Sequence, residues 1–287
     1  MLSNKVSEIM TTSLTNTPGS RSVFEVMEGM VAEDVGRIVV TDRDIPVGIF
    51  TEKDVLKRVV NKVDPKKTMI REVMTAPIRA VREETHIVEA FGKMYRGKFR
   101  HLLVRGRRGK IVGIVSMRRI LGLAVELGQT LAETKTKTLG DIMSSGAPTV
   151  DESLSIAEAL NEMVEKALTS VVVTANGKPC GIFTERDVLK RVAVKDISVK
   201  KSPIKEVMTS PLITMAGSQL IRDVLAEMYR RDIRNMPVKG AGGDLIGIVS
   251  MADILQYAQA FDIDEKVRQT WREVQEHYDS EDQYTPG

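Results

Sequence analysis

Apolar and polar positions follow one pattern that recurs four times along this chain. In the clearest copy, residues 156–167 place apolar side chains three and four positions apart, which predicts a helix with one apolar face. The apolar runs 171–173 and 181–183 predict two strands, and Asn176-Gly177 between them predicts a hairpin turn. A helical pattern returns at residues 187–193. The predicted order in each copy is therefore short strand, helix, strand, strand, helix.

Two sequence landmarks recur at nearly equal intervals. A methionine after a short apolar step stands at Met10, Met74, Met143 and Met208, at intervals of 64, 69 and 65 residues. A glycine opening a Gly-Ile-(Phe/Val)-(Thr/Ser) step stands at Gly48, Gly113, Gly181 and Gly247, at intervals of 65, 68 and 66 residues. Because two independent landmarks keep the same spacing, the chain contains four homologous repeats.

A longer period groups the repeats in pairs. Residues 48–60 and 181–193 differ at two of 13 positions, and residues 113–121 and 247–255 differ at two of nine. The offset of 133–134 residues indicates that a pair of repeats was duplicated. The expected domains are repeat 1 (1–64) and repeat 2 (65–134), forming module 1, repeat 3 (135–199) and repeat 4 (200–260), forming module 2, and a C-terminal helix and acidic tail (261–287).

The junction between the last strand and the last helix of each repeat carries the candidate chemistry. A hydroxyl is followed three positions later by an acid in Thr51/Asp54, Thr184/Asp187 and Ser250/Asp253, but by a cation in Ser116/Arg119. This spacing is that of a helix capping box, which alone would explain it. The same geometry also suits a nucleotide, because the N-terminus of a helix attracts phosphate and a carboxylate can accept hydrogen bonds from a ribose diol. Small apolar strand residues upstream would form a slot for a flat base.

The fourfold repeat resembles the cystathionine beta-synthase (CBS) domain. The resemblance rests on Gly-Ile-(Phe/Val)-(Thr/Ser)-x-x-Asp in three copies and on Ile-Arg-Asn-Met-Pro-Val at 233–238, and it covers about residues 1–260. It implies an α/β (α+β) fold of four βαββα repeats, paired through their sheets into two Bateman modules with two clefts each. The general layout is similar to that of the gamma subunit of AMP-activated protein kinase.

The resemblance also implies a function. The protein would be a sensor or regulator without catalytic residues, binding an adenine nucleotide (AMP, ADP or ATP) and acting in trans on a protein partner. S-adenosylmethionine and NAD are the less common ligands of the family.

Roles for individual residues follow from the same resemblance. Ribose hydroxyls would be held by Asp54, Asp187 and Asp253. Phosphate would be contacted by Thr51, Thr184, Ser250, Lys53 and Arg186. Adenine would be flanked by Leu14, Ile38, Val39, Ala147, Val171, Val172, Leu212, Met236 and Pro237, all of which equally suit a plain hydrophobic core.

Repeat 2 departs from the pattern at Arg119. A guanidinium cannot accept hydrogen bonds from a ribose diol, so this site is expected to be empty or to bind a ligand differently. Arg118 and Arg119 would instead reach toward the phosphates of a nucleotide in the neighbouring cleft. A solvated basic helix end is the alternative.

Composition narrows the functional classes. Hydrophobic residues make up 42% of the chain and charged residues 28%, as in a soluble globular protein. No apolar run approaches the ~20 residues of a membrane span, and the polar start of the sequence shows no secretory signal, so we expect a cytoplasmic protein without membrane association. One cysteine and three scattered histidines exclude a disulfide framework and a cysteine zinc cluster, and no metal site is expected.

Two rival functions remain open, and the first follows from the distribution of charge. Residues 1–134 carry 23 Lys and Arg against 16 Asp and Glu, while residues 262–287 carry 3 against 8. A basic stretch in repeat 2 contains Arg96, Lys98, Arg100, His101, Arg105, Arg107, Arg108 and Lys110. It could contact polyphosphate, or it could make the protein a nucleic-acid-associated regulator. The other rival is a purely structural module in which the capping boxes are only caps.

The tail contains a separate helical stripe. Ile263, Val267 and Trp271 fall four residues apart on a charged helix. This helix would dock on the chain's own modules, or it would bind a partner or a second copy in a homodimer.

Overall fold

All four repeats have the element order that the sequence predicts. The computed structural model describes residues 5–126, 137–195 and 197–257. In each repeat a short strand pairs in parallel with the first strand of an antiparallel hairpin, and helices cover one side of the sheet. The mixed α and β fold class is therefore confirmed.

Repeats 1 and 3 are built alike. Repeat 1 contains η1 (Val6–Glu8), β1 (Asn16–Pro18), α1 (Val23–Ala32), β2 (Arg37–Asp42), β3 (Ile45–Thr51), α2 (Glu52–Asp54) and the π-helical η2 (Val55–Val59). Repeat 3 contains η4 (Leu139–Asp141), β7 (Ser144–Ser145), β8 (Thr149–Asp151), α6 (Ile156–Glu165), β9 (Ser170–Ala175), β10 (Lys178–Thr184), α7 (Glu185–Asp187) and the π-helical η5 (Val188–Ala193).

Repeats 2 and 4 each end in an α-helix, α5 or α9, in place of a π-helical segment. Repeat 2 contains α3 (Ile70–Val73), β4 (Ala80–Arg82), α4 (Ile87–Arg96), β5 (His101–Arg105), β6 (Ile111–Ser116) and α5 (Met117–Glu126). Repeat 4 contains η6 (Ile204–Glu206), β11 (Met215–Ala216), α8 (Ile221–Arg230), β12 (Asn235–Lys239), β13 (Leu245–Ser250) and α9 (Met251–Tyr257).

The Asn-Gly turn of repeat 3 joins two antiparallel strands, as predicted. Asn176 and Gly177 have φ angles of +50° and +75°, the left-handed conformation that a two-residue hairpin turn requires. The register pairs Ala175 with Lys178 directly across this turn. Local sequence therefore determines the hairpin.

The two landmarks of the repeat meet in space. A Cβ atom on Gly113 would lie 2.8 Å from the sulfur of Met10, and a Cβ atom on Gly247 would lie 2.8 Å from the sulfur of Met143. Gly48 lies against Met74 and Gly181 against Met208 in the same way. Each repeat therefore lays its first segment on the last strand of its module partner, and only glycine leaves room for the crossing methionine.

Backbone hydrogen bonds secure these crossings. Thr209 N donates to Ile182 O at 2.8 Å, and Ile182 N donates back to Thr209 O at 2.9 Å. Thr75 and Ile49 make the same exchange in module 1. Within module 1 the two sheets also face each other, and Val39, Leu103 and Ile114 are buried between them.

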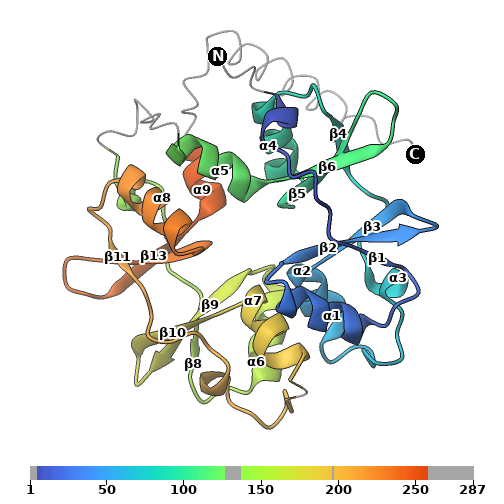
Figure 1. The fold of residues 1–287 in the computed structure, drawn as a ribbon. Helices are drawn as coiled ribbons and strands as arrows, with labels where there is room; N and C mark the ends of the chain where they lie inside the picture. The colour runs from blue at the N-terminus through green and yellow to red at the C-terminus, as the bar shows by residue number, and fades with distance from the viewer. Residues whose placement is uncertain (1–4, 127–136, 196, 258–287) are drawn as a thin grey trace, which may run out of the picture.

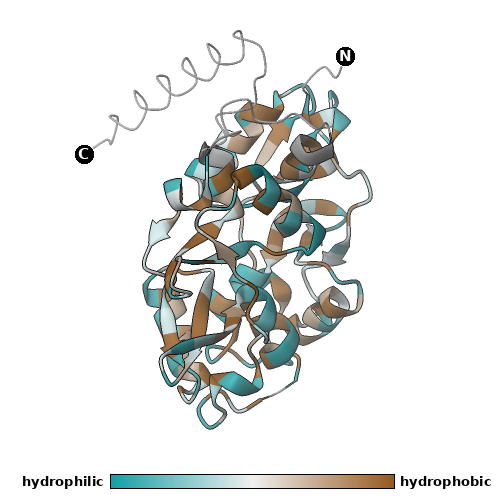
Figure 2. Ribbon diagram, turned by 90° about the vertical axis from the view of Figure 1, so that its left-hand side faces the viewer, coloured by the Kyte–Doolittle hydropathy of each residue, from teal (hydrophilic) through white to brown (hydrophobic). Residues whose placement is uncertain are grey.

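The two largest hydrophobic cores run between modules. The helices of repeat 1 share one core with those of repeat 3, where η2 packs against η5. The helices of repeat 2 share the other core with those of repeat 4, where α5 packs against α8. Figure 1 shows the resulting ring, in which repeat 1 has repeats 2 and 3 as neighbours and repeat 4 completes the circle. In Figure 2 the strands are mostly hydrophobic, and hydrophilic residues follow the outer helix turns.

Candidate functional site

The junction in repeat 3 brings three polar side chains together. Asp187 Oδ2 accepts hydrogen bonds from the backbone N of Thr184 at 2.9 Å and from its hydroxyl at 2.7 Å, so the capping box is formed. The other carboxylate oxygen accepts a bond from the Thr209 hydroxyl at 2.8 Å, and Arg191 Nε lies 3.5 Å from that oxygen. Asp187 therefore joins the start of the last helix of repeat 3 to the first segment of repeat 4.

Repeat 1 reproduces this geometry. Asp54 Oδ2 accepts from Thr51 N at 2.9 Å and from the Thr51 hydroxyl at 2.8 Å, and Oδ1 accepts from the Thr75 hydroxyl at 2.8 Å. Arg58 lies 3.6 Å from the same carboxylate. Asp54 and Asp187 are each only 5% exposed, so both carboxylates depend on these donors for solvation.

The junctions of repeats 4 and 2 differ. Ser250 donates to Asp253 from its backbone N and its hydroxyl, both at 2.8 Å, and Asp253 is half-buried. In repeat 2 the backbone N of Arg119 donates to the Ser116 hydroxyl at 3.2 Å, which is the capping bond without the acid. The repeat 2 backbone therefore matches the other repeats, while its side chain differs.

A cavity of about 480 Å³ opens beside Asp187. It is lined by Arg100, Thr169, Ile182, Thr184, Glu185, Arg186, Asp187, Thr209, Ile213, Arg231, Asp232, Ile233, Arg234 and Asn235. These residues come from both repeats of module 2, except Arg100, which comes from repeat 2 in module 1. Three isoleucines supply an apolar surface, while four arginines and three carboxylates supply the polar one. A cavity of this volume is in the range that encloses a small organic ligand.

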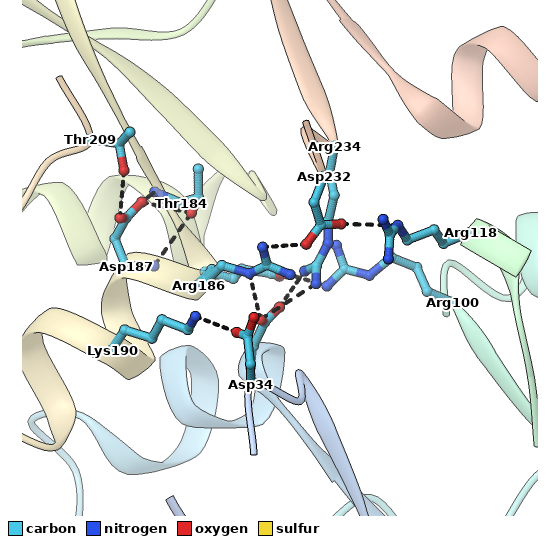
Figure 3. A network of polar contacts seen from close by, with 12 residues as sticks. Asp34, Arg100, Arg118, Thr184, Arg186, Asp187, Lys190, Thr209, Asp232 and Arg234 are labelled. Atoms are coloured by element: carbon cyan, nitrogen blue, oxygen red, sulfur yellow. Dashed lines mark hydrogen bonds and ion pairs between the residues drawn. The ribbon is translucent and has the colours of Figure 1, made fainter. Parts of the chain in front are cut away.

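An ion-pair network joins this cavity to the centre of the ring (Figure 3). Arg234 binds Glu52 and Arg100 binds Glu185, so each buried glutamate is paired with an arginine from the other module. Arg186 Nη1 lies 2.5 Å from Asp232, and its Nε lies 3.4 Å from Glu52.

Two further pairs extend the network. Arg118 Nε lies 3.0 Å from Asp232, and Lys190 binds Asp34.

Burial and charge shift the pKa values in this network. Burial alone would lower the pKa of Arg100, but Glu185 and Glu52 outweigh it and raise that pKa. Burial lowers the pKa of Lys53 and of Arg37. Burial and the nearby guanidinium groups of Arg37, Arg100 and Arg234 hold the pKa of His101 well below its usual range. The surroundings of His101 therefore favour its neutral form.

The cations proposed for phosphate contact occupy distinct places. Lys53 Nζ donates to the carbonyl of Lys98 at 3.1 Å, whereas Arg186 is held by Asp232 and Glu52. Arg118 crosses into repeat 4, where it lies 3.0 Å from Asp232 and 5.1 Å from the ring centroid of Tyr229. It thus reaches a residue that lines the cavity of the neighbouring module.

The apolar residues proposed to flank adenine divide between the two faces of their sheets. Ile38, Val171 and Met236 lie in the inter-module cores. Their neighbours Val39, Val172 and Pro237 are also buried, but alternation along the strand turns them to the opposite face.

The other residues proposed to flank adenine belong to the first segments of their repeats, which lie against the module partner. They are Leu14, Ala147 and Leu212. Leu14 packs beside Val39 and Ile114, and Leu212 N donates to Cys180 O at 3.2 Å. Ala147 follows β7, which pairs with β13 of repeat 4.

Several residues of the site carried no predicted role. Thr75 and Thr209 directly follow the landmark methionines, and Glu52 and Glu185 directly follow the capping threonines. Their recurrence in corresponding repeats was the only available signal. Arg234 and Asp232 could not be placed from the sequence because their partners are in other repeats.

The basic stretch of repeat 2 does not form one surface. Arg100 belongs to the central network, and the half-buried His101 lies beside its arginines. Arg107, 85% exposed, lies 3.5 Å from Glu84, while Arg105 donates to the Gly109 carbonyl.

Three further expectations concern the tail, metals and membranes. The predicted helix after residue 260 lies outside the described residues. Within the described residues, no group of three or more His, Cys, Asp and Glu side chains is arranged to hold a metal. None of the helices in the described part of the chain is long and apolar enough to span a bilayer.

Comparison with known proteins gives one family over most of the chain. The model of the CBS domain family matches residues 6–61, 70–126, 139–194 and 204–260. The CBS domain-containing protein CBSCBSPB1 of Arabidopsis thaliana is 26% identical over 281 residues, covering 85% of this chain and 51% of that protein. Protein MJ1404 of Methanocaldococcus jannaschii is 27% identical over 273 residues, covering 90% of this chain and 62% of that protein. The chain thus spans about half the length of the curated relatives it matches.

Solved structures show the same fold. Protein MJ1225 of Methanocaldococcus jannaschii superposes with a TM-score of 0.78 at 16% identity, covering 88% of this chain and 99% of the other. A conserved protein of Pyrococcus horikoshii gives a TM-score of 0.60 at 20% identity, with the same coverage.

Proposed function

Since the chain belongs to the CBS domain family and contains four CBS domains, we propose that it is a non-catalytic regulator that binds an adenine nucleotide (AMP, ADP or ATP) and acts on a protein partner in trans. The observation that carries this proposal is the cavity beside Asp187. It combines an apolar surface, a hydroxyl and acid pair, and several guanidinium groups around one volume.

Each part of a nucleotide has a chemically matching surface in this cavity. Ile182, Ile213 and Ile233 would contact the flat base. Asp187 and Thr209 would bind the ribose hydroxyls. Thr184 and the arginines at the cavity edge would bind phosphate, because guanidinium groups form paired, charge-assisted hydrogen bonds to its oxygens.

Binding of ribose would alter the contacts of Asp187. Its carboxylate already accepts three hydrogen bonds and lies beside Arg191, which uses the roughly four acceptor positions of a carboxylate. A ribose hydroxyl would compete with Thr209 for Oδ1. Ligand binding would therefore weaken one link between the last helix of repeat 3 and the first segment of repeat 4, a change that a partner could recognise.

The other repeats differ in how completely they could repeat this mode of binding. Asp54 has the full set of contacts made by Asp187, and Asp253 has the capping contacts. Arg119 offers no acceptor. We propose at most three nucleotide sites of this kind, with the repeat 2 site empty or differently used.

Isothermal titration calorimetry with AMP, ADP, ATP and S-adenosylmethionine tests the proposal on protein shown by extraction to carry no nucleotide. Asp187→Ala should remove one class of sites. Asp244→Ala is the matched control because this exposed acid lies in a turn of module 2, away from the residues that line the cavity. Absence of binding to the wild type would reject the proposal.

A further inference from the structure

Asp232 and Lys98 occupy equivalent positions in the two modules. Each follows the C-terminus of a long helix, α8 or α4, by two residues, and each has a left-handed φ, +54° for Asp232 and +51° for Lys98. The backbone is therefore the same, while the side-chain charge is opposite.

Asp232 lies at the cavity and holds two cations. Its Oδ2 accepts from Arg186 Nη1 at 2.5 Å, and its Oδ1 lies 3.0 Å from Arg118 Nε. Oδ1 is buried and makes no hydrogen bond to the described residues, so its contact with Arg118 is an ion pair alone. In module 1 the equivalent of Arg186 is Lys53, which donates to the backbone carbonyl of Lys98 at 3.1 Å.

The arginines that line the cavity are each paired with a carboxylate. Arg100 binds Glu185, Arg234 binds Glu52, Arg186 binds Asp232 and Arg231 binds Glu227. The cavity therefore offers little uncompensated positive charge. A ligand with one phosphate group could share these guanidinium groups, whereas added phosphates would approach the carboxylate of Asp232, which carries the same sign of charge.

We propose that Asp232 sets the phosphate preference of the Asp187 cavity, admitting nucleoside monophosphates and disfavouring di- and triphosphates by charge repulsion. This inference rests on the proposed nucleotide binding and adds the residue that selects among nucleotides. In module 1 the equivalent residue, Lys98, is a cation and would give no such barrier.

The test compares ATP with AMP in a background that isolates the cavity. The Asp54→Ala, Asp253→Ala double variant removes the other two proposed sites, and calorimetry gives the ratio of the ATP and AMP dissociation constants. Asp232→Asn should lower this ratio by about tenfold and Asp232→Lys by more, because like charges in contact disfavour binding strongly. If the double variant does not fold, the same ratio is taken in the full chain for the binding component that Asp187→Ala removes.

Matched variants separate charge from structure. Asp232→Glu keeps the charge and should keep the wild-type ratio, and Asp223→Asn on the exposed face of α8 should leave the ratio unchanged. Loss of AMP and ATP affinity in equal proportion in Asp232→Asn would mean that Asp232 only positions Arg186, which overturns the proposal. An unchanged ratio in both Asp232→Asn and Asp232→Lys overturns it as well, while nucleotide binding itself stands. Absence of any nucleotide binding by the wild type overturns this inference together with the proposed function.

Discussion

Glu52 of repeat 1 and Arg234 of repeat 4 form an ion pair at the centre of the ring, although 182 positions separate them in the sequence. Glu52 is 2% exposed, and Arg186 Nε lies 3.4 Å from the same carboxylate. One buried acid thus compensates guanidinium groups from repeats 3 and 4. This contact makes repeat 1 part of the polar surroundings of the cavity in module 2.

Removing Glu52 should destabilise the whole ring. Glu52→Ala leaves Arg186 and Arg234 without their shared partner, and breaking a buried pair in this way costs about 3–5 kcal/mol. Urea denaturation measures the loss. Glu83→Ala is the matched control because Glu83 pairs with the exposed Arg107, and it should cost less than about 1 kcal/mol. A loss as small as that of the control would show that water solvates the centre of the ring.

Gly247, where the segment containing Met143 crosses the last strand of repeat 4, should tolerate no side chain. A Cβ atom at Gly247 would lie 2.5 Å from the carbonyl oxygen of Ser144, a backbone atom that cannot move aside. Gly247→Ala should destabilise the protein by about 1–3 kcal/mol or more, measured as a shift in thermal or urea unfolding.

Two variants calibrate that result. A Cβ atom at Gly29 in α1 would meet no atom within 4 Å, so Gly29→Ala should stabilise the protein by about 0.5–1 kcal/mol. At Gly48 the obstruction is the flexible side chain of Met74, so Met74→Ala should partly rescue Gly48→Ala. Equal stability of Gly247→Ala and wild type would contradict the crossing as described.

Stability should depend on pH through His101. Burial, followed by the charges of Arg37, Arg100 and Arg234, holds its pKa in the folded state well below 6.5. The unfolded chain therefore binds a proton below about pH 6.5 that the folded protein does not, and stability falls as pH drops from there toward the folded-state pKa. The slope is at most about 1.4 kcal/mol per pH unit.

The sequence of module 2 suggests a variant that tests this effect. Asn235 is the equivalent of His101 in module 2, so His101→Asn replaces one with the other. Free energies of unfolding at about pH 5.5 and pH 7.5 should differ less in His101→Asn than in the wild type. The same difference in both proteins would show that other groups account for the pH dependence.

Placing an acid at position 119 of repeat 2 should stabilise the start of its last helix. The Arg119 backbone N already donates to Ser116 at 3.2 Å, the distance found between Asp253 N and Ser250 in repeat 4. Arg119→Asp should complete the capping box and stabilise the protein by about 0.5–2 kcal/mol. If nucleotides bind as proposed, it should also raise the calorimetric stoichiometry by one site. Arg119→Ala is the control, and an equal gain in both variants would mean that loss of positive charge, not the new acceptor, is responsible.

The sequence predicts the parts of this protein that depend on local order. The four repeats, the Asn176-Gly177 hairpin and the Thr184/Asp187 capping box all follow from residues close together in the chain. The membership in the CBS family follows as well, because it rests on motifs inside each repeat.

Contacts between repeats could not be predicted in the same way. Apolar periodicity identifies which side of a helix is buried but not which other face covers it. The main cores join repeat 1 with repeat 3 and repeat 2 with repeat 4, instead of closing within each module. The apolar pattern along the chain does not specify this choice. The bond from Thr209 to Asp187 and the pairing of Arg100 with Glu185 depend on that assembly.

The inter-module cores join equivalent elements, η2 with η5, in the manner of an interface between two identical subunits. The ring is in effect a homodimer whose two subunits have become one polypeptide. In a true homodimer every substitution appears twice, and both clefts must change together. Within one chain each cleft can diverge alone, as Asp232 has diverged from Lys98 and Arg119 from Asp253. If nucleotides bind as proposed, a fused ring can therefore respond to two different ligands at sites that share one ancestry.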